Sequence, residues 1–138
     1  MTQSYAQEEI DKLIAAFFSA FDNRTGSEPR LTAVLGCFAD KAVIARSVGP
    51  AIQIYTAMEF ATPRIELLTS GTLVDFHETE TSSSTNILGS LATRTSRYRK
   101  AGLLDGAPCA GVGTKFFQLV ALDSGWRILS LAWIDDEA

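Results

Sequence analysis

The chain has 138 residues, 46% hydrophobic and 20% charged, which is typical of a single globular domain spanning residues 1–138. Its formal net charge of −4 argues against nucleic acid as a partner, because a phosphate backbone selects basic surfaces. No apolar run approaches the roughly 20 residues that span a bilayer, so we expect no membrane partner. The polar, acidic residues 1–12 lack the pattern of a secretory signal.

The two cysteines, Cys37 and Cys109, are too few for a disulfide framework. Cys37 lies in an apolar stretch with helical spacing, and Cys109 lies near the start of a predicted strand. We therefore expect both to be reduced thiols, which favours a cytoplasmic location.

The first part of the chain has the periodicity of helices. Apolar residues recur at helical spacing from Ile10 to Phe21, after a candidate capping box at Ser4, so a helix is predicted over residues 5–23. Residues 23–26 break it, and Pro29 suits the first turn of a second, shorter helix. The predicted buried positions of that second helix are Leu31, Val34, Leu35 and Phe38.

A strand pair and a third helix are predicted next. Residues 42–47 and 51–55 form the two strands, with a turn between them at residues 48–50. Thr56 and Glu59 have the spacing of a capping box, which predicts the start of a third helix. We expect Pro63 to bend this helix and residues 70–71 to end it.

The remaining residues predict long strands. Residues 72–81 and 88–100 form two of them, separated by the polar run 82–86, and a loop follows at residues 103–108. Residues 109–122 and 126–135 complete the sheet as a hairpin around Asp123-Ser124-Gly125. Helices followed by runs of strands favour an α+β fold with an antiparallel sheet.

Five segments together resemble a known fold family. They are the helix 10–21, the junction 38–43, the row 76–80, the row 91–98 with Ser96 and Tyr98, and the closing hairpin with Gly125-Trp126-Arg127-Ile128. They are similar to uncharacterised bacterial members of the nuclear transport factor 2-like, or SnoaL-like, superfamily. The resemblance implies a cone-shaped, cystatin-like fold in which a curved antiparallel sheet wraps around about three helices. Such folds enclose a pocket that serves isomerases, dehydratases, cyclases and binding modules.

His77 is the single histidine and the first candidate catalytic residue. On a regular strand Asp75 shares its face, and a carboxylate beside an imidazole can orient it as a general base. Tyr98 would then donate a hydrogen bond to a substrate carbonyl. A solvent-exposed polar strand explains the same pattern, since most side chains on this face are polar.

The candidate ligand-binding residues are Tyr55, Glu78, Arg94, Trp126 and Trp133. An arginine inside a pocket binds a carboxylate or phosphate through its forked donors, whereas an ion pair with acids of neighbouring strands is the alternative for Arg94. Glu78 shares a strand face with Glu80. The two carboxylates could act as a general acid and base, or they could simply lie at the solvent-exposed end of a strand. The aromatic residues suit an apolar pocket or the core. Trp126 and Trp133 are an odd number of residues apart, so on a regular strand they face opposite sides of the sheet.

We expect no metal and no cofactor. A single histidine cannot complete a common transition-metal ligand set. The sequence also contains no glycine-rich phosphate loop and no dinucleotide-binding fingerprint, because Gly111 and Gly113 form only an isolated pair.

The strand predicted over residues 109–122 is apolar on both faces. Phe116, Gln118, Val120 and Leu122 alternate with Phe117, Leu119 and Ala121, and both sets are largely apolar. Helices cover only the concave side of such a sheet, so we expect a second copy of the chain to cover the convex side as a homodimer.

Three functions fit these observations. The first is a small-molecule-binding protein with an apolar pocket between the helices and the curved sheet. The second is a cofactor-free lyase or isomerase acting on a small, apolar, carbonyl-bearing substrate. The third is a dimeric scaffold without catalysis.

Overall fold

The computed structural model, which describes residues 3–136, begins with helix α1 (Gln3–Ser19). Ile10, Ile14, Phe17 and Phe18 form its buried face, as the helical spacing predicts. The helix ends four residues earlier than predicted. The reason lies at Asn23, whose backbone N–H donates to the carbonyl oxygen of Phe76 instead of to a helical partner.

Helix α2 (Leu31–Leu35) is a single short turn that leads into strand β1 (Phe38–Val48). The sequence placed Phe38 on the second helix, and this is wrong, because Phe38 is the first residue of β1. The chain is already tied to the sheet one residue earlier, where the carbonyl oxygen of Cys37 accepts from the N–H of Ile128 at 2.9 Å. Strand β2 (Ala51–Thr56) returns antiparallel to β1.

Helix α3 (Ala57–Thr69) begins at the predicted capping box. The Thr56 hydroxyl accepts from the N–H of Glu59 at 3.1 Å, and the Glu59 carboxylate accepts from the N–H of Thr56 at 2.9 Å. Pro63 lies inside the helix. Ser70 is the C-terminal cap residue, and Gly71 follows with a positive φ of 86°, so the helix ends where the sequence predicted.

Four long strands follow: β3 (Leu73–Leu88), β4 (Leu91–Leu104), β5 (Ala107–Leu122) and β6 (Gly125–Asp135). The predicted break at residues 82–86 is wrong, because this polar run continues β3 and pairs with β4. It can do so because β3 is an edge strand, on which most of these polar side chains are exposed. The predicted loop 103–108 is a two-residue turn, in which Asp105 and Gly106 both have positive φ.

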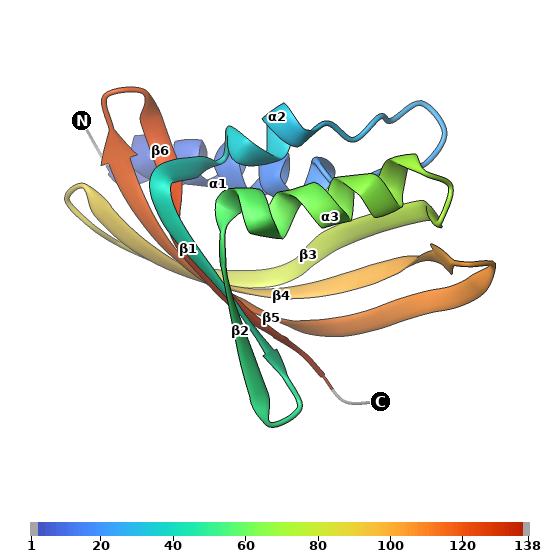
Figure 1. The fold of residues 1–138 in the computed structure, drawn as a ribbon. Helices are drawn as coiled ribbons and strands as arrows, with labels where there is room; N and C mark the ends of the chain where they lie inside the picture. The colour runs from blue at the N-terminus through green and yellow to red at the C-terminus, as the bar shows by residue number, and fades with distance from the viewer. Residues whose placement is uncertain (1–2, 137–138) are drawn as a thin grey trace.

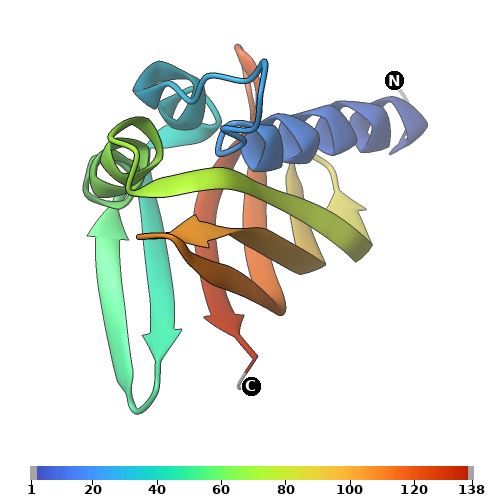
Figure 2. The same ribbon diagram turned by 90° about the vertical axis from the view of Figure 1, so that its right-hand side faces the viewer.

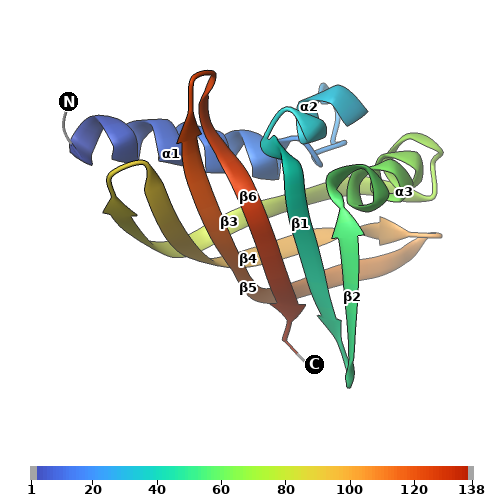
Figure 3. The same cartoon turned by 60° about the vertical axis from the view of Figure 1, so that its left-hand side comes forward.

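The six strands form one curved sheet in the order β2-β1-β6-β5-β4-β3. All neighbours are antiparallel except β1 and β6, which lie side by side and run parallel (Figure 3). The three helices lie on one side of the sheet (Figures 1 and 2). The predicted α+β architecture, a curved sheet around three helices, is thus confirmed, with one parallel pair within it. None of the helices in residues 3–136 has the length and apolarity to cross a membrane.

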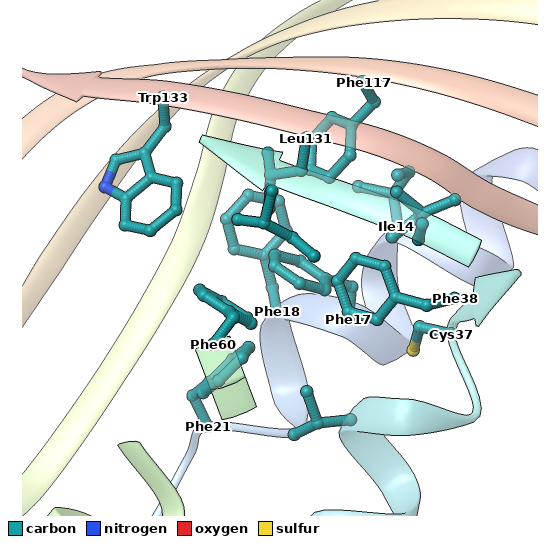
Figure 4. Close-up of a cluster of buried hydrophobic side chains, with 14 of the residues drawn as sticks. Ile14, Phe17, Phe18, Phe21, Cys37, Phe38, Phe60, Phe117, Leu131 and Trp133 are labelled. Atoms are coloured by element: carbon teal, nitrogen blue, oxygen red, sulfur yellow. The ribbon is translucent and has the colours of Figure 1, made fainter. Parts of the chain in front are cut away.

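Aromatic rings fill the space between α1 and the sheet (Figure 4). The ring of Phe17 lies at the centre, with centroid distances of 5.3 to 6.0 Å to its four aromatic neighbours, Phe18, Phe21, Phe38 and Phe117. Phe60 of α3 extends this cluster to Trp133, whose centroid lies 5.5 Å away. Trp133 therefore stands at the edge of the packed core.

Candidate functional site

A cavity of about 440 Å³ adjoins the aromatic cluster, under helix α3. Its apolar walls come from the end of α1, from α3 and from the strand ends, and include Phe21, Phe60, Leu67, Leu104 and Trp133. Phe60 and Trp133, which pack edge to face at the border of the ring cluster, both lie on this wall. Charged side chains occupy the sheet side of this space.

Lys115 of β5 is the most deeply buried of these charged groups. Its Nζ lies 2.9 Å from Oε1 of Glu78 on β3 and 3.9 Å from the ring centroid of Tyr98. Burial lowers the pKa of Lys115, although the carboxylate of Glu78 opposes this shift. The pair places an amine and a carboxylate together on the wall of an otherwise apolar cavity.

Asp135, at the end of β6, is the centre of a second charged cluster. It accepts hydrogen bonds from Lys100 Nζ at 3.0 Å and from the Tyr98 hydroxyl, and Arg46 Nη2 lies 3.6 Å away. Burial alone would raise the pKa of Asp135, but the bonds from Tyr98 and Lys100 outweigh it, and the pKa is lowered. Burial and the bond to Asp135 raise the pKa of Tyr98, which therefore stays protonated.

Arg64 of α3 borders the same cavity among aromatic rings. Its guanidinium carbon lies 4.4 Å from the ring centroid of Phe60, 5.2 Å from Trp133 and 5.8 Å from Tyr55. Burial lowers the pKa of Arg64, and the nearby charge of Arg46 lowers it further. The arrangement presents a cation against flat apolar surfaces.

Solved structures with this architecture are numerous. A nuclear transport factor 2-like superfamily protein from Salmonella enterica matches with a TM-score of 0.81 at 12% identity, covering 99% of this chain and 95% of that one. The chain has the nuclear transport factor 2-like fold. A provisionally assigned aromatic ring hydroxylase from Novosphingobium aromaticivorans matches at 0.80, with 18% identity over 100% of this chain and 94% of that one.

A provisionally assigned dehydratase of the nuclear transport factor 2-like family, from Streptomyces avermitilis, matches at 0.76, with 14% identity over 99% of this chain and 100% of that one. No protein-family model matches the sequence, and no curated protein matches it at a significant level. The likeness to these structures therefore extends to the fold.

Three of the five predicted ligand-binding residues line the cavity: Tyr55, Glu78 and Trp133. Trp126 does not, and it packs half-buried against the core. Arg94 lies outside the cavity, beneath α1, where it donates to both carboxylate oxygens of Glu80, to Asp11 at 2.6 Å and to Thr85 at 3.2 Å. For Arg94 the structure thus shows the ion-pair alternative.

The structure does not bring the three predicted catalytic residues together. Asp75 is exposed, with a φ of 51°, in an irregular part of β3 between Val74 and His77 where simple alternation fails. His77 lines a second, more open hollow between α1 and β3, where its Nδ1 is buried without a hydrogen-bond partner. Tyr98 is buried beside Asp135. Catalysis by these three residues stays a prediction.

Most of the charged cavity residues were not singled out from the sequence: Arg46, Arg64, Lys100, Lys115 and Asp135. A signal for Lys115 was present, because it precedes Phe117 and Leu119 at a spacing of two residues and therefore shares their buried face. A signal for Arg64 was its spacing of four residues from Phe60, which places both on one face of α3. Residues 3–136 contain no group of three or more side chains placed to hold a metal ion.

Proposed function

We propose that this protein binds a small, largely apolar molecule in the cavity under α3. The observation that supports this most directly is the space itself, about 440 Å³ beside a tightly packed aromatic core. Volumes of roughly 300 to 1,000 Å³ are usual for small-molecule pockets, which combine apolar walls with a few polar groups. The rings of Phe60 and Trp133 would supply the apolar walls and the charged side chains the orienting groups.

The buried charges favour a binding role over a purely structural one. Placing Lys115 and Glu78 inside the protein costs desolvation energy that their mutual attraction offsets only in part. An apolar pair of similar volume would stabilise a scaffold at least as well. Charged groups on a cavity wall are therefore better explained by a ligand that they position.

A cavity-blocking substitution tests the proposal. Leu67 lies on the cavity wall, so Leu67→Trp should obstruct it, whereas Leu88→Trp makes the same change at a position of β3 that is 84% exposed and outside the cavity. The probe is N-phenyl-1-naphthylamine, a neutral dye that fluoresces in apolar surroundings. We expect the wild type and Leu88→Trp to bind it and Leu67→Trp to lose most of the binding. Equal binding by all three proteins would contradict the proposal.

Cofactor-free lyase or isomerase chemistry on a small carbonyl-bearing apolar substrate is the second candidate. The Glu78 carboxylate favours it, because it lies on the cavity wall where a general base would meet a bound substrate. A fold neighbour provisionally assigned as a dehydratase belongs to the same reaction class. His77 is the alternative base from the sequence prediction, although it lines the second hollow and not this cavity. The test is turnover of an α,β-unsaturated ketone. Loss of turnover in Glu78→Gln, with turnover intact in His77→Ala, would identify Glu78 as the base.

We also propose that the protein is a homodimer through the convex face of the sheet. Ile54, Ala45, Ala132 and Phe116 lie opposite one another across four adjacent strands and form an apolar row on this face. Ile54 is 70% exposed and Phe116 is 53% exposed in the single chain. A contiguous apolar surface of this kind is usual where a second copy packs.

A further inference from the structure

The positive and negative charges of the side chains that line the cavity are unequal in number. They comprise four cations and two carboxylates: Arg46, Arg64, Lys100, Lys115, Glu78 and Asp135. Glu78 pairs with Lys115, and Asp135 is shared between Lys100 and Arg46. Although the whole chain carries a formal charge of −4, the cavity therefore has an excess of positive charge. The local charges, not the net charge, decide which ligand is attracted.

Arg64 is the cation that the cavity leaves without a counterion. Within residues 3–136 no carboxylate lies at ion-pairing distance from its guanidinium. Glu78 and a hydrogen bond with Tyr55 favour its charge, whereas burial and the charge of Arg46 oppose it. Its Nη1 donates to the carbonyl oxygen of Phe60 at 2.9 Å. A guanidinium carries five N–H donors, so most remain for a ligand.

A partly buried, unpaired cation is costly, and an anion that enters the cavity would remove this cost. Arg64 is half-buried on the cavity wall, and this burial lowers the pKa of its guanidinium. The rings of Phe60 and Trp133 hold the guanidinium in place at 4.4 and 5.2 Å. Little side-chain freedom would then be lost when a ligand binds.

We propose that the ligand of this cavity is an aromatic or similarly flat apolar molecule carrying one carboxylate, which Arg64 binds. The inference rests on the proposed binding function and specifies its ligand class. The two oxygens of a carboxylate match the fork of a guanidinium, and such charge-assisted pairs are stronger than neutral hydrogen bonds. The apolar body would lie against Phe60 and Trp133.

A matched pair of probes tests this inference. 2-Naphthoate and 2-naphthamide share one ring system and differ in charge, and calorimetric titration gives the dissociation constant of each. We expect the wild-type protein to bind naphthoate about tenfold more tightly or better. In Arg64→Gln the affinity for naphthoate should fall to that for naphthamide, while naphthamide binding stays unchanged.

Two further variants make the result specific. Arg30→Gln removes the same charge at a side chain that is 70% exposed and outside the cavity, so the preference for naphthoate should persist. Arg64→Lys keeps the positive charge but loses the forked donors, so we expect an intermediate preference for naphthoate. This variant replaces Arg64→Gln in the test if Arg64→Gln does not fold.

The outcomes separate the inference from the function on which it rests. Equal wild-type affinity for both probes would support the cavity as a binding site and overturn the carboxylate inference. A loss of both probes together in Arg64→Gln would show that Arg64 maintains the cavity, and it would likewise overturn the inference. Binding of neither probe to the wild type would contradict the proposed function as well.

Discussion

Gly113 shows how one residue makes room for the charged cluster at the end of β6. Its backbone lies against the Tyr98 hydroxyl and the carbonyl oxygen of Ile134, and a β-carbon would collide with both. The absence of a side chain lets the Tyr98 hydroxyl reach Asp135. In the sequence Gly113 was only one of an isolated glycine pair, because the side chain it accommodates lies on another strand.

We expect Gly113→Ala to lower the free energy of unfolding by about 2 kcal/mol, the usual cost of overpacking. Gly111→Ala is the matched control, because its β-carbon would meet only the side chain of Lys100, at 3.4 Å. Urea denaturation of both variants measures the difference. If Gly113→Ala were as stable as Gly111→Ala, the close approach of Tyr98 would not be a constraint.

The two cysteines should differ in reactivity. Cys37 is buried, and burial raises the pKa of its thiol to about 11, so little reactive thiolate forms at neutral pH. Cys109 is half-buried on the cavity wall. We expect iodoacetamide to modify Cys109 first, as measured by mass spectrometry of digested protein. Cys109→Ser should remove the fast reaction and Cys37→Ser should keep it; faster labelling of Cys37 would refute this assignment.

Among the elements, the end of α1 depends on Asn23. Its side-chain amide donates to the carbonyl oxygens of Leu68 and Leu73, at 3.0 and 2.6 Å, and accepts from the N–H of Phe76 at 2.7 Å. These bonds tie α1 to the end of α3 and to the irregular start of β3. The sequence identified Asn23 only as part of a helix break, since its partners lie about fifty residues away.

Replacing Asn23 with alanine should lower the free energy of unfolding by about 2 kcal/mol, because partly buried backbone groups lose their partners. Asn86→Ala, at an exposed position of β3, should have little effect. Thermal and urea denaturation compare the two variants. A loss of stability in Asn86→Ala equal to that in Asn23→Ala would exclude a specific role for the Asn23 bonds.

The elements also show what local pattern could predict. The α3 capping box at Thr56 and Glu59 was predicted correctly because both partners lie within one turn. The break predicted at residues 82–86 was wrong because polar composition alone does not distinguish a turn from an edge strand. The actual turns are shorter, at residues 89–90 and 105–106, where Gly89, Asp105 and Gly106 adopt positive φ.

At the scale of the whole molecule, the apolar convex face calls for a test of assembly. We expect the wild-type protein to sediment as a dimer at tens of micromolar. Phe116→Glu places a charge in the middle of the apolar row and should shift the protein toward monomer, whereas Leu88→Glu, at an exposed strand end, should not. A wild-type monomer would contradict the dimer proposal.

The sequence alone determined the helices, the number of strands and the α+β architecture, because spacing, capping and turn residues act over a few neighbours. Only the tertiary structure decided the composition of the cavity, whose charged residues Arg46, Arg64, Glu78, Lys100, Lys115 and Asp135 come from six different elements. Strand register and irregularities determine on which face of the sheet each side chain lies, and a shift of one residue moves it to the opposite face. Local patterns could indicate single members of the site, such as Glu78 and Trp133, but which of them meet in one cavity depends on the folded sheet.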